Sequence, residues 1–348
     1  MSHSLNQFVG QLIIAGFREH EAKYNLDIVR YIRDLNLGGI ILYDEDLEIG
    51  GLGTRNIKSK DQIWKLTQQL QSYSDNGLLI AIDQEGGSVT RLKPEYGFGK
   101  LCSWNHIGNM DDLLISEQFA SSISDDLKAC GINLNLAPVL DLNYGAETII
   151  GKSKRALSSE PKKIVKHARI FINILRNNNI ISCGKHFPGQ GSAYGDTHEG
   201  ITDVSGTWND KDLVPYSELI QSGDLDMVMV AHVFNRNIDH KFPASLSKNV
   251  INNILRKNLG FTGLVICDDP SMKAISDNYD LEQAFELMLN AGVDLFCLGN
   301  NLRYDKNYIS KSLSVLSNLV ETNKISEDRI YESINRVNML KDKFNINK

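Results

Sequence analysis

An aspartate and a histidine that could share a proton stand two residues apart, at Asp196 and His198, in a segment rich in turn-forming residues. In an extended stretch, side chains two apart face the same side. A carboxylate beside an imidazole holds its tautomer and raises its basicity, so His198 could serve as general acid and base near neutral pH. A surface loop with both residues by coincidence is the alternative. The adjoining Lys185 and His186, which end a predicted strand, favour the chemical role.

A second candidate is the aspartate pair Asp268 and Asp269, which follows an apolar run. Successive side chains of a strand alternate between faces, so one carboxylate at a given level can project inward. An aspartate facing an acid/base across a sugar can form a covalent glycosyl intermediate. The alternative role is the N-cap of the next helix. We assign catalysis to Asp268 and the place nearer the cap to Asp269, with Pro270 in the helix's first turn.

A third segment ends a predicted strand in Asp83 and continues through a glycine pair to Arg91. A carboxylate that accepts two hydroxyl groups is a common way to hold a pyranose ring. Arg91 could supply further donors or brace Asp83. Lys185 and His186, at the end of another predicted strand, could bind hydroxyl oxygens from a second side.

The elements that must position these groups alternate along the chain, with short apolar runs between helical patterns such as 160–177 and 281–289. This rhythm is typical of βαβ units with a parallel sheet. It predicts one (β/α)₈ TIM-type barrel, irregular in its first strands, with an open sheet as the alternative. The eight expected strands are 12–15, 39–43, 78–83, 134–142, 182–187, 227–232, 264–268 and 293–298.

Polar residues close several of these runs, and barrel enzymes carry their sites at that end because the βα loops converge there. Helix capping is the alternative for any one position but explains the set poorly. The residues concerned are Asp83, Asp141, Lys185, His186, His232 and Asp268. For His232, a site role and a core role are equally compatible with the sequence. Long loops are expected at 44–56 and 189–207, and glycines at 189, 191 and 195 would permit the second to close over a substrate.

Composition limits the classes of function. The 348-residue chain has a net charge of −6 and no block of like charge, which argues against the basic face of nucleic-acid-binding proteins. Its five cysteines are odd in number and show no CxxC spacing, so we expect free thiols in a reducing compartment. No metal-ligand spacing, signal peptide or membrane span is recognisable. We therefore expect a cytoplasmic monomer with one domain over 1–348.

Three of these segments resemble motifs of the family 3 glycoside hydrolases. KHFPGQG at 185–191 resembles the family's KHFPGHG, DQEGGSVTR at 83–91 its DQEGG-x-V-x-R, and ICDDPSM at 266–272 its SDDLSM. The match continues in order through NLAPVLDLN at 135–143 and AHVFNRNIDHKFPASLS at 231–247, so it covers most of the chain. The resemblance is strongest to single-domain bacterial N-acetyl-β-glucosaminidases of peptidoglycan recycling.

The resemblance implies a role for each candidate. Asp268 corresponds to the nucleophile, His198 to the acid/base and Asp196 to its partner. The sugar-binding positions correspond to Asp83, Arg91, Arg155, Lys185 and His186. Arg155 lies in KRALSSEP, where the family tends to have RSFGxDP, so its assignment is the less secure one. Gln190 replaces a histidine of the family motif and cannot titrate.

The resemblance also implies the reaction. It is hydrolysis of terminal β-linked N-acetylglucosamine with retention and without a cofactor, on a muropeptide in which that sugar is linked to 1,6-anhydro-N-acetylmuramic acid. Asp196 and His198 supply an acid from within the barrel, whereas β-glucosidases of the family take theirs from a separate C-terminal domain. A phosphorylase that uses phosphate in place of water is one alternative. A sugar-binding barrel without catalysis is the other.

Overall fold

The protein is described here by a computed structural model that covers residues 5–347. The expected absence of a signal peptide and the expected domain bounds, 1–348, involve residues 1–4 and Lys348, which lie outside this range. Eight parallel strands form a closed barrel in chain order, with β8 paired to β1. The predicted TIM-type barrel is confirmed. The strands are β1 Ile13–Gly16, β2 Gly39–Leu42, β3 Leu79–Ile82, β4 Leu134–Asn135, β5 Ile181–Phe187, β6 Met227–Val230, β7 Leu264–Cys267 and β8 Leu295–Leu298.

Helices surround the barrel, and the two predicted at 160–177 and 281–289 are confirmed as α7 and α10. α10 begins with a capping box between Asp280 and Gln283 and ends at Gly292 in a left-handed conformation. The α-helices are α1 Leu5–Gly10, α2 Asp27–Leu35, α3 Lys60–Ser72, α4 Trp104–Met110, α5 Leu113–Ala129, α6 Ile149–Lys152, α7 Pro161–Asn177, α8 Val214–Gln221, α9 Lys273–Ser276, α10 Leu281–Ala291, α11 Tyr308–Glu321 and α12 Glu327–Lys343. Short 3₁₀ turns η1 Pro94–Tyr96, η2 Asp210–Leu213 and η3 Ala244–Leu246, and the π-helix η4 Asn249–Asn258, complete the set.

The strands are buried on both faces, which explains their uninterrupted apolar sequences. Alternate residues belong to two separate clusters. Ile14 and Ile41 pack inside the barrel, whereas Ile13 and Ile40 pack outward into the layer shared with the helices. The core is thus divided by the sheet, as the two-residue period of a strand requires.

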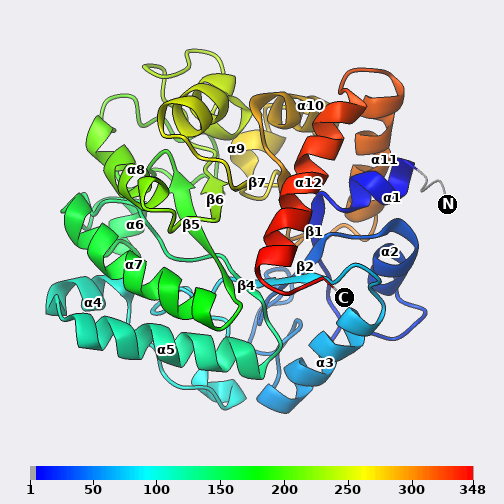
Figure 1. Cartoon of the computed structure of the whole chain (residues 1–348), viewed down its shortest axis with the longest axis horizontal. Helices are drawn as coiled ribbons and strands as arrows, with labels where there is room; N and C mark the ends of the chain where they lie inside the picture. The colour runs from blue at the N-terminus through cyan, green and yellow to red at the C-terminus, as the bar shows by residue number, and fades with distance from the viewer. Residues whose placement is uncertain (1–4, 348) are drawn as a thin grey trace.

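The last long helix, α12, lies across one end of the barrel (Figure 1). Its Val337 and Leu340 belong to the same cluster as the inward-facing strand residues. Arg329 and Arg336 of α12 donate to the buried carboxylate of Asp294, which precedes β8. α12 therefore covers the end at which the strands begin, and the opposite end, where they terminate, is left for a site.

The irregularity expected in the first strands lies instead at β4 and β5. β1 to β3 pair in continuous register, so that expectation was wrong. β4 has only two residues of the nine predicted at 134–142. Beyond its end, Pro138 has no N–H to donate to a neighbouring strand. The register between β5 and β6 shifts between Gly184 and Phe187.

Candidate active site

A pocket of about 230 Å³ opens at the C-terminal ends of the strands. All eight residues singled out from the sequence line it, together with Glu85, Gln190 and Asp269. Its lining includes Ile41, Leu136 and Met229 from inside the barrel. The predicted residues are Asp83, Arg91, Arg155, Lys185, His186, Asp196, His198 and Asp268.

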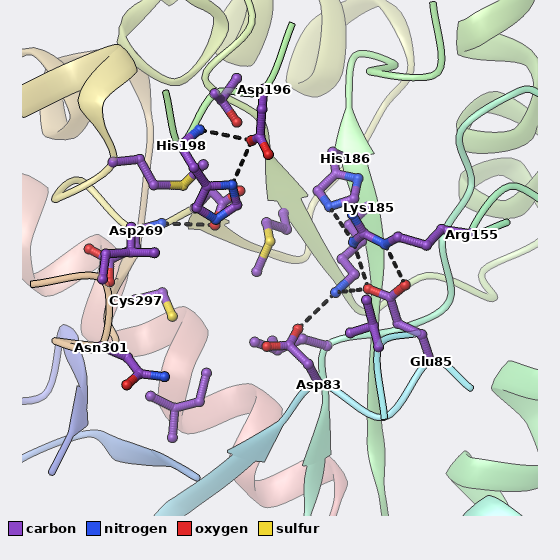
Figure 2. A pocket seen from close by; sticks show the side chains of 18 of the residues that line it. Asp83, Glu85, Arg155, Lys185, His186, Asp196, His198, Asp269, Cys297 and Asn301 are labelled. Carbon is purple, nitrogen blue, oxygen red and sulfur yellow. Dashed lines mark hydrogen bonds and ion pairs between the residues drawn. The ribbon is translucent and has the colours of Figure 1, made fainter. Parts of the chain in front are cut away.

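One side of the pocket is a network of buried charges (Figure 2). Lys185 Nζ lies 2.8 Å from Asp83 Oδ1 and 2.6 Å from Glu85 Oε1. Arg155 makes a two-pronged contact with Glu85, from Nε to Oε2 at 2.8 Å and from Nη2 to Oε1 at 2.7 Å. Bidentate geometry of this kind fixes the guanidinium plane. The network presents oriented N–H donors and carboxylate acceptors, the groups needed to bind sugar hydroxyls.

The charges in this network support one another. Burial raises the pKa of Glu85, but the adjacent charges of Arg155 and Lys185 outweigh it, and the net pKa is far below its usual value. Burial lowers the pKa of Lys185, and the charges of Asp83 and Glu85 again reverse the shift. Both side chains are therefore charged at neutral pH.

His186 is fixed from two sides within this network. Its Nδ1 lies 2.6 Å from Asp141 Oδ2, and its Nε2 lies 3.2 Å from Arg155 Nη2. Because a guanidinium can only donate, Nε2 accepts, and the ring hydrogen is on Nδ1 and donates to Asp141. Lys185 and His186 both line the pocket although they are consecutive. The register shift of β5 at this point explains this departure from alternation.

Arg91 makes only long contacts with the carboxylates near it, longer than would be needed to hold Asp83 in place. Its guanidinium lies 3.8 Å from Asp83 Oδ2 and 3.9 Å from Asp44 Oδ1, and Lys93 also pairs with Asp44. Arg91 also lies over the Tyr43 ring, 5.5 Å from its centroid. The side chain is thus placed over the pocket with hydrogen-bonding capacity to spare.

Asp268 follows β7 directly and is half-buried at the pocket. Its Oδ1 accepts a 2.9 Å hydrogen bond from the backbone N–H of Asp269. Burial raises the pKa of Asp268, but electrostatic interactions with the imidazoles of His232, His186 and His198 and the hydrogen bond from Asp269 N–H outweigh it, so the net pKa is lowered. An ionised carboxylate at this place has the charge that a nucleophile needs.

Asp196 and His198 lie on another side of the pocket, in the loop that follows β5 (Figure 2). His198 Nδ1 lies 2.7 Å from Asp196 Oδ1, and the same oxygen accepts the backbone N–H of His198 at 2.9 Å. Between them, the carbonyl of Thr197 accepts from Ala274 N–H at 3.1 Å, which ties this loop to the segment after β7. Nδ1 is engaged by Asp196, so Nε2 is the nitrogen left to exchange a proton with a substrate.

Residues 4–340 match the glycosyl hydrolase family 3 N-terminal domain. The chain belongs to glycosyl hydrolase family 3. It is 33% identical over 315 residues to a beta-hexosaminidase of Psychromonas ingrahamii, a match covering 88% of this chain and 86% of that one. It is 34% identical over 275 residues to a beta-hexosaminidase of Bordetella avium, covering 76% and 74%.

The solved structures agree with this placement of the family 3 hydrolase. The β-N-acetylglucosaminidase from Paenibacillus sp. superposes with a TM-score of 0.89 at 32% identity over 99% of this chain. This chain spans 63% of the length of that protein. The β-N-acetylhexosaminidase from Beutenbergia cavernae superposes with a TM-score of 0.85 at 25% identity, covering 98% of this chain and 99% of that one. The protein is thus a glycoside hydrolase.

The loop at 189–207 of this family 3 hydrolase is anchored at its start. A Cβ on Gly191 would lie 2.0 Å from the carbonyl oxygen of Leu142, and one on Gly189 would lie 2.6 Å from Asp212 Cβ. These two glycines permit close packing at the start of the loop, and closure of the loop over a substrate stays a prediction. The exposed part of the loop begins at Tyr194, just before the Asp196–His198 pair.

The loop at 44–56, which was predicted, is also held in place. Arg55 is completely buried and donates to the carbonyl oxygens of Gly299 and Asn300 and to Asn301 Oδ1. These contacts tie the loop to the segment after β8. Leu47 of the loop lines the pocket and is 55% exposed, so this rim is partly apolar.

Asp269 does not cap a helix, contrary to expectation. α9 begins at Lys273 with Met272 at its N-cap position, and Pro270 lies in the turn before it, not in its first turn. Asp269 Oδ1 accepts from Ser271 N–H at 2.9 Å and Oδ2 from Gly299 N–H at 2.8 Å. The carboxylate therefore joins the end of β7 to the end of β8, a contact between distant segments that local spacing does not indicate.

His232 is a buried histidine with partners on both ring nitrogens. Nδ1 lies 2.7 Å from Ser245 Oγ and Nε2 lies 3.1 Å from the carbonyl oxygen of Asp269. It is 1% exposed and does not line the pocket. The structure therefore places it behind Asp268 and Asp269.

Two site residues were missed as candidates from the sequence. Glu85 stands two residues after Asp83, and in an extended segment this spacing would have placed both on one side. Asp141 was recognised only as a polar residue closing a strand. Besides His186 Nδ1, it accepts the backbone N–H of Gln190 at 2.7 Å. A long-range partner of this kind has no signal in a single sequence.

The structure also bears on metal ligands, membrane-spanning helices and the cysteines. No cluster of three or more metal-ligating side chains occurs among residues the structure describes. Within the same range, no helix has the length and apolar character needed to cross a bilayer. All five cysteines are free thiols, with Cys183, Cys267 and Cys297 in strands as expected.

Proposed function

We propose that the protein is a retaining exo-β-N-acetylglucosaminidase with Asp268 as nucleophile and His198 as acid/base. The observation that supports this most is that an ionised, half-buried Asp268 and the Asp196–His198 pair line one pocket. The relatives named beta-hexosaminidase and the solved β-N-acetylglucosaminidase support the choice of sugar. The pocket's lining by inward-facing barrel residues favours the end of a sugar chain over its middle.

In the proposed reaction Asp268 attacks the anomeric carbon while His198 Nε2–H protonates the leaving oxygen. The bond to the leaving group breaks and a glycosyl ester forms on Asp268. His198 then takes a proton from water, which attacks the same carbon and releases the sugar with its original configuration. Asp196 holds His198 by Nδ1 and stabilises the imidazolium when it is protonated. This replaces one carboxyl group of the usual glycosidase pair by an imidazole.

The charged network orients the sugar in this proposal. Lys185 and Arg155 present N–H groups to hydroxyl oxygens, while Asp83 and the Nε2 of His186 can accept from hydroxyl hydrogens. Arg91, with only long contacts to Asp83 and Asp44, can turn toward the sugar without breaking a short ion pair. Hydrogen bonds that strengthen as charge develops on the ring would lower the barrier.

We further propose a muropeptide substrate and a cytoplasmic site of action, both supported by resemblance to the N-acetyl-β-glucosaminidases of peptidoglycan recycling. The 348 residues are proposed to act as one domain and as a monomer. A direct check is release of N-acetylglucosamine from purified muropeptides with the anhydro sugar, compared with chitobiose. Equal or better activity on chitobiose would contradict the muropeptide preference.

Hydrolysis can be separated from its two rivals by one assay. The protein is incubated with p-nitrophenyl N-acetyl-β-glucosaminide, with and without inorganic phosphate, and products are followed by NMR. Free N-acetylglucosamine, formed first as the β-anomer and at a rate independent of phosphate, is expected. A sugar 1-phosphate as the main product would indicate a phosphorylase. No p-nitrophenol release from folded protein that still binds the sugar would indicate a barrel without catalysis.

A further inference from the structure

The peptide groups on both sides of Asp269 Cα are held by contacts that the proposed reaction does not use. Asp269 N–H donates to Asp268 Oδ1 at 2.9 Å. On the other side of the same Cα, the carbonyl oxygen of Asp269 contacts His232 Nε2 at 3.1 Å. The Asp269 side chain is fixed in addition by the N–H groups of Ser271 and Gly299. The residue after the nucleophile is thus held at its carbonyl and its carboxylate.

The hydrogens in this chain of contacts can be assigned from donor and acceptor chemistry. A carbonyl oxygen can only accept, so the hydrogen between His232 and Asp269 is on Nε2. In the neutral ring Nδ1 then accepts the hydroxyl hydrogen of Ser245, 2.7 Å away. Burial lowers the pKa of His232 more than nearby Asp268 raises it, in agreement with a neutral ring.

The carbonyl oxygen of Asp269 is the only polar group of the peptide bond that follows this residue. Pro270 follows Asp269, so the peptide bond between them has no N–H and its carbonyl oxygen is the only polar group available. Asp269 is 8% exposed, and its carbonyl oxygen accepts from Met272 N–H at 3.0 Å as well as from His232 Nε2–H at 3.1 Å. Of these two partners, His232 is the one that lies outside the turn after β7, so it is the contact that ties this turn to another part of the chain.

We propose that His232 is a positioning residue that, through the carbonyl of Asp269, holds the Asp269 N–H on Asp268 Oδ1 and so orients the nucleophile. The inference rests on the proposed function, because it assumes that Asp268 attacks the substrate. His232 acts here as a hydrogen-bond donor and not as a charge, and it contacts neither substrate nor reacting atoms.

The pH dependence of activity would depend on the charged and titratable groups that surround Asp268 and His232. Asp268 is influenced by His232, His186 and His198, and by the adjacent Asp269. His232 is influenced by Asp268 and His198. The neighbouring strand thiols, Cys267 and Cys297, have a pKa raised by burial and are neutral at neutral pH.

The test compares His232→Leu, which cannot donate, with His232→Gln, whose amide N–H can donate at nearly the same position. On p-nitrophenyl N-acetyl-β-glucosaminide, we expect kcat of His232→Leu to fall by about 10- to 100-fold with little change in KM, the scale typical of misplaced catalytic groups. The acid limb of its kcat/KM profile should move to higher pH because Asp268 loses a well-aligned donor. His232→Gln should recover most of kcat and the wild-type acid limb.

His167 provides a matched control for the loss of a buried histidine. It is completely buried, with Nδ1 2.6 Å from Ser116 Oγ and Nε2 2.9 Å from Asp111 Oδ1, but it belongs to α7 and does not line the pocket. His167→Leu should lower thermal stability while kcat and the pH profile of the folded fraction stay as in the wild type.

The outcomes distinguish this inference from the proposed function. If His232→Gln is as impaired as His232→Leu, the donor role is wrong. If His232→Leu keeps wild-type kcat and acid limb while Asp268→Ala is inactive, the positioning inference fails and the nucleophile assignment stands. If Asp268→Ala remains active, the proposed function itself fails. Circular dichroism shows whether His232→Leu is folded. If it is not, Ser245→Ala takes its place, and the acid limb of its kcat/KM profile should shift in the same direction by a smaller amount.

Discussion

One carboxylate oxygen of Glu85 joins two cations of the site, lying 2.6 Å from Lys185 Nζ and 2.7 Å from Arg155 Nη2. Glu85 is 4% exposed and Lys185 is 2% exposed. The carboxylate thereby neutralises two positive charges that would otherwise be buried side by side. Its loss would affect stability and substrate binding together.

Glu85→Gln should destabilise the protein at neutral pH by about 3–5 kcal/mol, the scale for breaking a buried ion pair. The folded-state pKa of Glu85 is lowered from 4.5, so its ionisation stabilises the fold fully above that pH and less as the pH falls toward the folded value. The stability difference between wild type and variant, measured by urea unfolding, should therefore shrink below about pH 4.5. Glu48→Gln, which removes the 43%-exposed partner of Arg18, should cost less than about 1 kcal/mol. A difference that is constant between pH 7 and pH 3 would contradict the assignment.

Asp268→Ala should remove the covalent step and nearly all activity. Asp269→Ala should act differently, because it deprives the half-buried N–H group of Ser271 and the buried N–H group of Gly299 of their acceptor. Each such loss costs about 1–3 kcal/mol, more than a helix cap would. Activity should be reduced but measurable in the folded fraction. Kinetics and thermal unfolding on the two variants check this, and an active Asp268→Ala beside an inactive Asp269→Ala would reverse the nucleophile assignment.

Asp83→Ala should weaken binding of the substrate and of the transition state. The carboxylate is proposed to accept from sugar hydroxyls, and it also partners Lys185 Nζ at 2.8 Å. Truncating one partner of a buried charged hydrogen bond costs about 2–5 kcal/mol. We expect kcat/KM to fall by at least about tenfold, since 1.36 kcal/mol corresponds to one power of ten. A variant with unchanged kcat and KM would place Asp83 outside the substrate contacts.

His198→Ala should lose far more activity on a disaccharide or muropeptide than on an aryl glycoside. A p-nitrophenolate departs without a proton, whereas a sugar alkoxide needs one. Because His198 also activates water in the second step, glycosyl-enzyme should accumulate on aryl substrates. Azide, a nucleophile that needs no general base, should then speed turnover and yield the β-glycosyl azide.

Asp196→Ala should show a milder form of the same pattern, because the imidazole remains but loses its 2.7 Å partner on Nδ1. Rates are compared on substrates that differ only in leaving group, with and without azide. Equal losses on activated and unactivated substrates, without an azide effect, would move the acid/base role to a different residue.

The sequence alone was enough to predict the strands, the helices and most of the site residues. Strands such as β7 and helices such as α7 follow from local apolar periodicity, which a single chain displays directly. Chemistry-bearing residues were identifiable because charged groups that close apolar runs are costly without a function. Resemblance to family motifs then assigned roles to Asp268 and His198, and the structure places both at one pocket.

Tertiary structure alone decided the partners of those residues. Glu85 meets Arg155 across 70 positions, Asp141 meets His186 across 45, and the Asp269 carboxylate meets Gly299 across 30. Such pairings depend on how the strand ends are brought together when the barrel closes. Local patterns carry the period of each strand or helix but not the register between distant ones. For that reason, a side chain that looked like a helix cap in the sequence is an anchor between β7 and β8 in the fold.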